Sequence, residues 1–184
     1  MVTTIFQTQR LRAVEWRDDH AEVAHAAYSR PEFVQHLGNP QPHPDLDHTR
    51  RWIVRIHEMN AGHVGGFWAV EARDSGTLVG ATLCHPIPDG IGEYEIGWHV
   101  FPAHQRNGYA KEIGRGAAAY AFDVLGLAEV IAVVKPDNAP SLAVARAIGM
   151  QSRGHTSRYF NVEVELFALS RAQFAAGEPT APRP

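Results

Sequence analysis

One stretch of the chain constrains the fold more than any other: between Gly90 and Tyr120, a predicted strand passes through a short loop into a predicted helix. Alternating residue types indicate the strand, and Pro102 ends it because proline cannot continue a central ladder. Alanine-rich sequence with apolar residues at helical spacing predicts the helix, over 110–125. Between them lies the loop Gln105-Arg106-Asn107-Gly108-Tyr109-Ala110.

This strand–loop–helix unit has the properties of an anion-binding site. The first N–H groups of a helix have no intrahelical partner, and the helix dipole is positive at that end. Gly108 has no side chain that would keep a phosphate away from the backbone, and Ala110 keeps the next turn small. Arg106 and Lys111 add positive charge nearby. The loop is therefore expected to bind a phosphate group.

Two other phosphate-binding patterns fit the sequence less well. The chain contains no G-x-x-x-x-G-K-[ST] run, which argues against a Walker-type nucleotide site. A G-x-G-x-x-A match begins at Gly114, but it lies inside the predicted helix and not at a strand-to-helix turn. Close packing of the helix on the sheet explains Gly114 and Gly116 better than a dinucleotide site does.

The central strand carries carboxylates, although such a strand is ordinarily buried on both faces. Glu93 and Glu95 share one face with His99, and the other face is apolar: Tyr94, Ile96, Trp98 and Val100. Burial or mutual repulsion would raise a carboxylate pKa towards the working range of a general base. The structural alternative is an ion pair with arginine or histidine. Both interpretations stay open for Glu95, the ion pair is favoured for Glu93, and His99 is a candidate proton relay.

The predicted elements alternate between strands and helices in a way that defines the fold class. The order predicts an α/β fold, with a mixed, mostly antiparallel central sheet, one parallel pair where a helix crosses over, and flanking helices on both faces. The remaining strands are expected at 10–16, 67–72, 77–85, 130–134, 151–160 and 162–169. The remaining helices are expected from Asp18 or Asp19 to Tyr28 and at 31–37, 49–60 and 141–148.

Length and composition limit the possible classes of protein. The chain has 184 residues, 45% of them hydrophobic and 20% charged, which fits one soluble domain, predicted over 1–174 with a disordered tail at 175–184. A net charge of −3 argues against a general nucleic-acid or membrane-surface binder. No apolar stretch is long enough to cross a bilayer, and the N-terminus lacks the apolar segment of a signal peptide.

The single cysteine and a histidine-rich loop need separate interpretation. Cys84 lies in an apolar run, so a buried structural thiol is favoured over a nucleophile, and one cysteine suits a reducing cytoplasm. No metal is expected, because the clustered potential ligands match no zinc pattern and an aspartate there can cap the next helix. These residues are His36, His43, Asp45, Asp47 and His48.

The loop from Gln105 to Ala110 resembles the Q/R-x-x-G-x-G/A signature of the GNAT superfamily of N-acetyltransferases. The resemblance covers about Thr8 to Arg171. Three segments are similar to the ribosomal-protein alanine acetyltransferase (Rim-type) branch: Gln9-Arg10-Leu11-Arg12, Glu95-Ile96-Gly97-Trp98 and the closing segment 163–169. The resemblance implies a cytoplasmic enzyme, a monomer or homodimer, that moves an acetyl group from acetyl-CoA directly to a primary amine of a protein N-terminus or small molecule.

The same resemblance implies roles for individual residues. Glu95 matches a strand glutamate that acts as base, in some cases through water. Backbone groups of His99, Val100 and Phe101 would pair with pantetheine, and backbone amides of the loop would hold the pyrophosphate: Gln105, Arg106, Asn107, Gly108, Tyr109, Ala110 and Lys111.

A second element of the family, N-x-x-S/A, is matched by Asn138 to Ser141. The resemblance implies that Asn138 contacts pantetheine or fixes the separated strands, and that Ser141 bonds the cofactor or protonates the departing thiolate. Both are also good helix caps. The family's usual tyrosine acid is replaced here by Ala145, so that role is vacant or falls to Ser141 or another tyrosine, such as Tyr159.

Two alternatives to acetyl transfer follow from the same residues. A larger donor such as succinyl-CoA would need Arg50, Arg51 or a histidine near the thioester to meet its free carboxylate. A non-catalytic acyl-CoA-binding sensor or interaction module is the alternative of another class. The loop over 38–48 is expected, by the resemblance, to influence the choice of acceptor.

Overall fold

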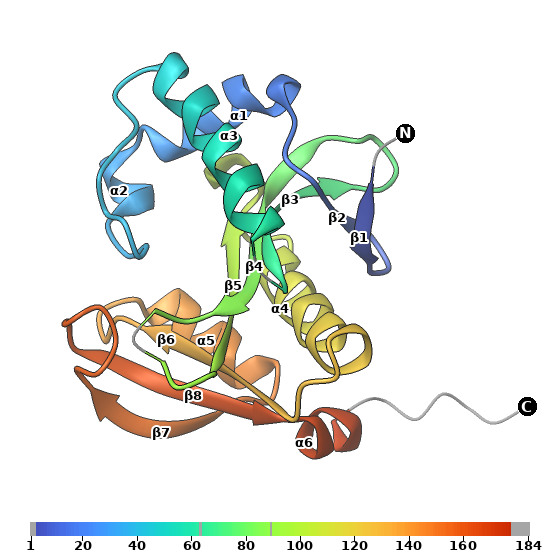
Figure 1. Ribbon diagram of the computed structural model, residues 1–184, viewed down its shortest axis with the longest axis vertical. Helices are drawn as coiled ribbons and strands as arrows, with labels where there is room; N and C mark the ends of the chain where they lie inside the picture. The colour runs from blue at the N-terminus through green and yellow to red at the C-terminus, as the bar shows by residue number, and fades with distance from the viewer. Residues whose placement is uncertain (1–2, 63, 89, 178–184) are drawn as a thin grey trace, which may run out of the picture.

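The computed structural model describes residues 3–62, 64–88 and 90–177. Within these residues the strands form one eight-stranded sheet in the order β1-β2-β3-β4-β5-β6-β8-β7 (Figure 1). Neighbouring strands are antiparallel except for the parallel pair β5 and β6, which confirms the predicted fold class. The strands are β1 Thr4–Gln7, β2 Leu11–Val14, β3 Gly66–Ala72, β4 Leu78–Pro86, β5 Tyr94–Val100, β6 Glu129–Val134, β7 Gln151–Thr156 and β8 Val164–Ser170.

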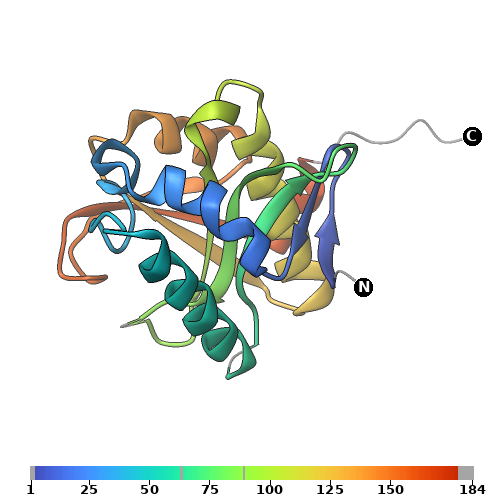
Figure 2. The ribbon, with the colours of Figure 1, turned by 90° about the horizontal axis from the view of Figure 1, so that it is seen from above.

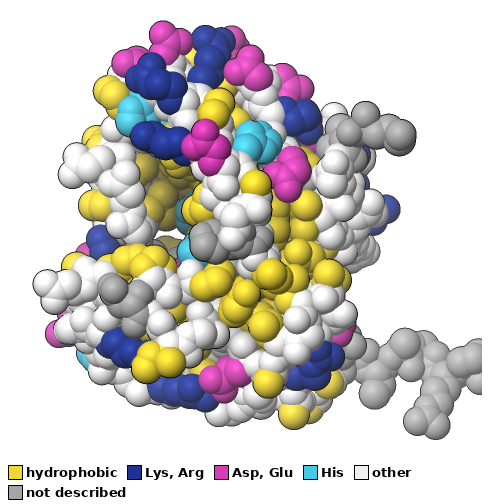
Figure 3. Space-filling model, viewed as in Figure 1, with side chains coloured by type: hydrophobic (Ala, Val, Ile, Leu, Met, Phe, Trp, Pro, Cys, Tyr) yellow, Lys and Arg dark blue, Asp and Glu magenta, His cyan; other side chains and the backbone are white. Residues whose placement is uncertain are grey.

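Helices cover both faces of the sheet (Figure 2). One apolar core joins the sheet to α4 Tyr109–Ala119, α5 Ala139–Ala147 and α6 Arg171–Ala176. A second core joins it to α1 Ala21–Tyr28, α2 Pro31–Val34 and α3 Leu46–Ala61. A hollow opens between α2 and the strands β6 and β8 on the side seen in Figure 3. In the described part of the chain no helix is both long and apolar enough to cross a membrane.

The two faces of the central strand follow from its alternation. Ile96 and Trp98 pack with α4, while Glu95 and His99 face the hollow. Gly114 and Gly116 allow this close packing: a Cβ on Gly114 would lie 3.0 Å from Cε3 of Trp98. A Cβ on Gly116 would lie 2.6 Å from Cε2 of the ring of Phe6. The packing interpretation of these glycines is therefore correct.

The structure differs from the sequence prediction at several element boundaries and contains two elements that were not predicted. The helix predicted over 110–125 is α-helical only to Ala119 and continues as a π-helical turn, Tyr120–Val124. Strand β1 was not predicted, because it is four residues long and exposed at both ends. Helix α6 was also missed, although Ser170 and Gln173 form a capping box at its start. Since α6 reaches Ala176, the first two residues of the predicted tail are helical; 178–184 lie outside the described residues.

Both edge strands of the described sheet have irregular pairing. In β1 the register shifts between Thr4 and Phe6. In β7 it shifts between Ser152 and His155, where Gly154 has a φ of +87°. Such an extra residue in one strand of an antiparallel pair is a β-bulge, which bends and twists the strand locally.

Cys84 is fully buried in the core between sheet and α4, as the apolar run predicted. Burial raises the pKa of its thiol to about 12, so the thiol stays protonated and unreactive at neutral pH. The structural interpretation of Cys84 is confirmed.

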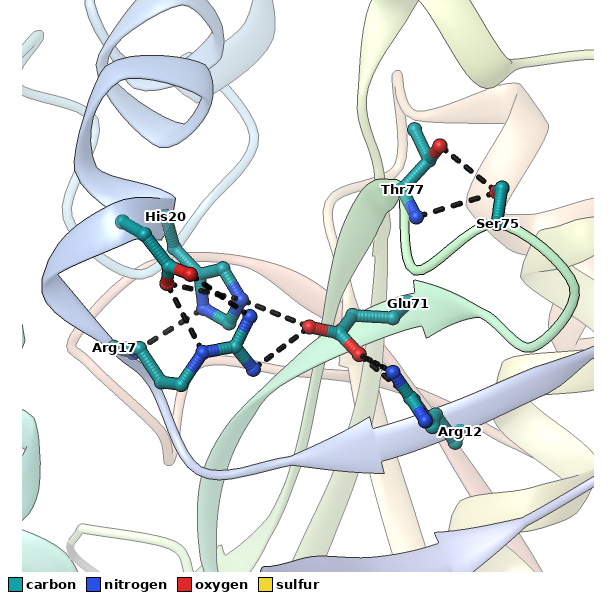
Figure 4. Close-up of polar contacts among 7 residues, drawn as sticks. Arg12, Arg17, His20, Glu71, Ser75 and Thr77 are labelled. Carbon is teal, nitrogen blue, oxygen red and sulfur yellow. Dashed lines mark hydrogen bonds and ion pairs between the residues drawn. The ribbon is translucent and has the colours of Figure 1, made fainter. Parts of the chain in front are cut away.

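A buried carboxylate on β3 joins two arginines and a histidine beside the sheet (Figure 4). Glu71 accepts hydrogen bonds from Arg12 Nε at 2.7 Å and from His20 Nε2 at 3.0 Å, and lies 2.8 Å from Arg17 Nη1. Burial would raise the pKa of Glu71, but hydrogen bonds from these partners outweigh it and hold the pKa below its ordinary value. The sequence gives no signal for this cluster, because Glu71 is 51 or more residues away from the other members along the chain.

We expect Glu71→Ala to lower the free energy of unfolding by about 2–3 kcal/mol at pH 7. Removing one partner of a buried pair costs roughly 3–5 kcal/mol, and the arginines here are about a third exposed, which lessens the cost. Urea denaturation measures the change, with Glu129→Gln as control because the Glu129–Arg153 pair is exposed. The difference should shrink in acid, as pH falls through the lowered pKa of Glu71. Equal effects of the two substitutions would contradict the assignment.

Candidate active site

The hollow lies where the two parallel strands of the sheet separate. β5 and β6 are paired only at Glu95 and Ile131 in the described residues, and beyond this point they diverge (Figure 1). The resulting cleft has a volume of about 570 Å³. It is lined by residues of β3, β4, β5, β6, β8 and of α1, α2, α3 and α5, by the segment after α2 and by the turn between β7 and β8. A sheet split in this way leaves backbone groups of both strands free to pair with a ligand.

Glu95 lies at the point where the strands separate, and its side chain lines the cleft. Burial raises the pKa of Glu95 to about 7, and a hydrogen bond from the backbone N–H of Val133 opposes this rise. Val133 belongs to β6, so the carboxylate takes the place of a strand partner for that N–H. At neutral pH the carboxyl group is about half ionised, which is the state that a general base needs.

The loop after β5 leaves the start of α4 open. Arg106 and Gly108 both have left-handed backbone, with φ of 64° and 75°. Gly108 is the N-cap of α4, and no side chain caps the first N–H groups of the helix. The side chain of Asn107 instead donates to the carbonyl oxygens of His104 and Gln105, at 3.0 and 3.2 Å. The first turn of α4 therefore keeps free donors for an anion.

Arg10 was not predicted to belong to this loop. Its Nη1 donates to the carbonyl oxygen of Asn107 at 3.0 Å, and its guanidinium lies over the ring of Tyr109, 4.8 Å from the centroid. Glu112 orients it by accepting from Arg10 Nε at 2.7 Å. Half-exposed positive charge thus lies beside the start of α4 in addition to Arg106 and Lys111.

The structure corrects one expectation about the strand backbone. The N–H of Phe101 donates to Val79 at 2.9 Å, so it is used by β4. Because hydrogen-bonded pairs alternate along antiparallel strands, the backbone of His99 also faces β4, and the backbone of Val100 faces the gap. Of the three residues predicted to pair with pantetheine, only Val100 is placed to do so. Its carbonyl oxygen now accepts from Gln105 Nε2 at 3.2 Å.

Comparison with known proteins bears on this geometry. Residues 10–151 match the family described as Acetyltransferase (GNAT) domain. The chain belongs to the GNAT acetyltransferase family. It is therefore an acyl-CoA-dependent N-acyltransferase.

Relatives and solved structures agree with this membership. The uncharacterized N-acetyltransferase YoaA of Bacillus subtilis is 29% identical over 155 residues, covering 84% of this chain and 87% of the relative. A GNAT-family acetyltransferase from Bacillus anthracis has the same fold, with a TM-score of 0.75 at 24% identity, covering 92% of this chain and 98% of that one. RimJ of Mycobacterium smegmatis, solved with CoA-disulfide, has a TM-score of 0.76 at 17% identity. The match covers 93% of this chain and 87% of the RimJ chain.

Glu93 does not form a carboxylate pair with Glu95 in this GNAT domain. β5 begins at Tyr94, so Glu93 lies in the preceding loop, where Arg158 donates to it at 2.9 and 3.1 Å. Burial would raise the pKa of Glu93, but hydrogen bonds from the Ile91 N–H, Tyr159 and Arg158 outweigh it and lower the pKa. The ion-pair interpretation of Glu93 is correct, and mutual repulsion is not the cause of the shift at Glu95.

Tyr159, the tyrosine that the sequence analysis offered as a possible acid, is not placed to act in the cleft. The hydroxyl of Tyr159 donates to Glu93 at 3.0 Å, and the side chain is fully buried outside the cleft lining. Tyr159 is therefore committed to the turn and is a poor candidate for the acid. Ala145 belongs to α5, and its side chain is buried in the core between α5 and the sheet.

His99 is held as a neutral ring. Its Nδ1 lies 3.0 Å from the hydroxyl of Tyr28, and burial lowers its pKa to about 4. With Tyr28 donating, the remaining proton is on Nε2, so His99 can donate a hydrogen bond in the cleft. A ring that resists protonation is a poor proton relay, so the relay suggested by sequence is disfavoured. Tyr28, which sequence analysis did not single out, is the partner of His99 Nδ1.

His85 was also missed, and its strand alternation was the available signal. It is the direct cross-strand partner of Glu95 and lines the GNAT cleft. Its Nδ1 donates to the carbonyl oxygen of Pro86 at 2.8 Å, which leaves Nε2 as an acceptor in the neutral ring. Directly opposed residues have Cβ atoms roughly 5 Å apart, so His85 is a neighbour of the candidate base.

Asn138 and Ser141 line the cleft from the start of α5. Asn138 is the N-cap, and its Oδ1 accepts from the N–H of Ser141 at 3.3 Å. The capping interpretation is thus correct for Asn138, and it is compatible with a place beside the cofactor. Capping also fixes Ser141 at the wall of the cleft.

The histidines and aspartates after α2 have partners within the protein. Asp45 caps α3 by accepting from the N–H of His48 at 2.6 Å, and His43 Nδ1 lies 2.9 Å from Thr49 Oγ1. His36 Nε2 lies 3.4 Å from Asp137. Among the described residues, no group of three or more such side chains is arranged to hold a metal ion.

Proposed function

We propose that this GNAT enzyme transfers an acetyl group from acetyl-CoA directly to a primary amine. The observation that carries the proposal is Glu95, a carboxyl group with a pKa of about 7, at the point where β5 and β6 separate. The uncapped start of α4 supports a site for the cofactor pyrophosphate, formed by the backbone amides of 105–111 with Arg10 beside them. That RimJ was solved with CoA-disulfide supports the same donor class.

Different residues of the cleft carry out different steps of the reaction. Acetyl-CoA supplies the thioester carbonyl, and the amine nitrogen forms the new bond to its carbon as the carbon–sulfur bond breaks. Ionised Glu95 takes the amine proton, directly or through one water, and the Ser141 hydroxyl or water supplies a proton to the sulfur. Val100 pairs with pantetheine, Asn138 holds the wall beside it, and neutral His99 offers an N–H to the acyl oxygen.

The proposal also covers the acceptor, the cellular location, the assembly and the partners of the enzyme. We place the acceptor among protein N-termini and small amines, and the enzyme in the cytoplasm as a monomer or homodimer of one domain over 1–174, without nucleic acid or membrane as partners. A succinyl donor is less well supported, because Arg50 lies beside Asp18 and Asp47 on the exposed side of α3. A non-catalytic CoA-binding module would have no need of a carboxyl group with a raised pKa in the cleft.

Isothermal titration with acetyl-CoA, and in parallel with succinyl-CoA, tests the donor. We expect micromolar binding of acetyl-CoA and weaker binding of succinyl-CoA. Among the described residues that line the cleft, Lys135 is the one lysine or arginine that could meet a second carboxylate, and it already donates to the carbonyl oxygen of Gln35. Release of free thiol in the presence of a panel of amines then tests turnover. Binding of succinyl-CoA alone would overturn the acetyl donor, and binding without turnover on any amine would favour the sensor.

A further inference from the structure

The cleft has few charged groups with which to hold an acceptor. Among the described residues that line it, Glu95 is the one carboxylate and Lys135 the one lysine or arginine. Lys135 Nζ donates to the carbonyl oxygen of Gln35 at 2.6 Å. His43 and His99 are neutral at pH 7, because burial lowers the pKa of each to about 4. An acceptor with several ammonium groups would lose water there without gaining counter-charges.

The wall opposite β6 is aromatic. The ring centroids of Tyr28 and Trp52 are 4.9 Å apart, and those of Trp52 and Phe67 are 5.7 Å apart. Phe67 in turn lies 5.5 Å from the ring of His99. All four line the cleft. Contacting rings of this kind form a rigid apolar surface that suits a flat apolar group.

The mouth of the cleft exposes apolar side chains to solvent. Met59 is 38% exposed, Phe160 36% and Val162 42%, and all three line the cleft. Exposed apolar residues that are grouped around a cleft mark a binding site more often than scattered ones do. The apolar lining therefore continues from the aromatic wall to the opening.

Phe160 occupies a conformation that its residue type disfavours. It lies in the turn between β7 and β8 with a φ of +55°, and the next residue, Asn161, has a φ of +53°. Asparagine tolerates the left-handed region, whereas a bulky aromatic residue there costs roughly 1–2 kcal/mol. The turn is held by Arg158 and Tyr159, both bonded to Glu93. Glycine or asparagine would suit this backbone better, so the chain presents the ring of Phe160 to the cleft at a conformational cost.

We propose that the acceptor is a small primary amine with a single positive charge, carried on an apolar body of about the size of one aromatic ring, and that Phe160 determines this preference. The inference rests on the proposed function and specifies its acceptor. The ammonium group is drawn to Glu95, and the apolar body lies between the aromatic wall and Phe160. Acceptor specificity is therefore set by the turn between β7 and β8 as well as by the segment after α2.

The turnover of three amines, measured at saturating acetyl-CoA, separates the effect of an aromatic ring from the effect of the number of charges. They are 2-phenylethylamine with one charge and a ring, n-butylamine with one charge and no ring, and spermidine with three charges. We expect kcat/KM for 2-phenylethylamine to exceed the values for the other two by about tenfold or more, the amount that burial of one ring supplies. Equal or faster turnover of spermidine would overturn the inference.

Two variants of Phe160 test its role. Phe160→Asn removes the ring and suits the left-handed backbone. It should raise KM for 2-phenylethylamine about tenfold and KM for n-butylamine by a smaller factor, because a butyl chain has less apolar surface to lose, with little change in kcat. The melting temperature should stay the same or rise. Phe160→Leu keeps an apolar side chain at the same backbone cost and should stay within about threefold of wild type. A uniform loss for all amines in Phe160→Asn would mean a structural role instead.

A binding measurement separates this inference from the proposed function. 2-Phenylethylamine is titrated into wild type and Phe160→Asn, each saturated with CoA. Binding that is weakened about tenfold in the variant supports the acceptor class even where no amine is acetylated. Turnover of other amines with no binding of 2-phenylethylamine would sink the acceptor class and leave the acetyltransferase intact.

Discussion

Replacement of Glu95 by glutamine should lower kcat/KM at pH 7 by about 100- to 1,000-fold, because a positioned general base contributes roughly 10²–10⁴. The affinity for acetyl-CoA should be nearly unchanged, since the donor site lies at the loop before α4. In the wild type, a plot of log kcat/KM against pH should change slope by one near pH 7, where Glu95 ionises. That change of slope should be absent in the glutamine variant.

Glu93→Gln is the matched control, because it removes a carboxylate two residues away that is ion-paired with Arg158. The Glu93→Gln enzyme should keep the change of slope of log kcat/KM near pH 7. It should lose only the stability of the turn that Glu93 holds. Loss of the slope change in both variants would assign it to some other group. A Glu95→Gln enzyme with wild-type kcat would contradict the assignment of the base.

Stability gives a second readout of the same carboxyl group that does not depend on any substrate. The folded-state pKa of Glu95 is raised by burial, so its contribution to stability is present in acid and is lost as pH rises through about 7. Glu95→Gln should therefore unfold at the same temperature as wild type near pH 4. Above pH 7.5 the variant should be more stable by about 1–3 kcal/mol, on the basis of roughly 1.4 kcal/mol per pKa unit.

Gly108→Glu should raise the dissociation constant of acetyl-CoA by about 100-fold or more. The backbone at Gly108 is left-handed, with a φ of +75°, which costs a side-chain-bearing residue roughly 1–2 kcal/mol. The added carboxylate would also stand at the uncapped start of α4, where it repels a pyrophosphate and takes its donors. Isothermal titration at 25 °C measures the change.

Two further substitutions at Gly108 separate backbone from charge. Gly108→Gln has the size and backbone cost of glutamate without the charge, and should weaken binding about tenfold. Gly108→Asn tolerates the left-handed region and should bind within a few-fold of wild type. A Cβ at this position would meet nothing closer than Arg10 Nη2 at 3.6 Å, so none of the three should clash with the fold. Wild-type affinity in all three would place the pyrophosphate elsewhere.

The unit from Gly90 to Tyr120 could be predicted because its signals are local. Alternation placed Ile96 and Trp98 on one face of the strand and Glu95 on the other, and the structure packs the first face against α4 and turns the second to the cleft. Gly108 marked the turn into α4. Each of these statements depends on residues that are close in the chain. The parallel pair β5 and β6 followed from the helix that connects them.

What could not be predicted depends on contacts between distant segments. Arg10 lies at the loop before α4 because Glu112 orients it, and no spacing in the sequence connects the two. Tyr28 and His99 are 71 residues apart and share a hydrogen bond. Glu93 was placed on the strand by extending the alternation one step too far, and only its contact with Arg158 shows that the strand begins later.

The bulges in β1 and β7 bear on the solubility of the protein. A regular free strand at the edge of a sheet offers a row of backbone donors and acceptors on which another chain can add, and this is a common start of aggregation. On both edges of the described sheet a bulge interrupts this row, and on β7 Arg153 adds a charge that is paired with Glu129. The bulges therefore work against the addition of a second chain's strand at either edge of the described sheet.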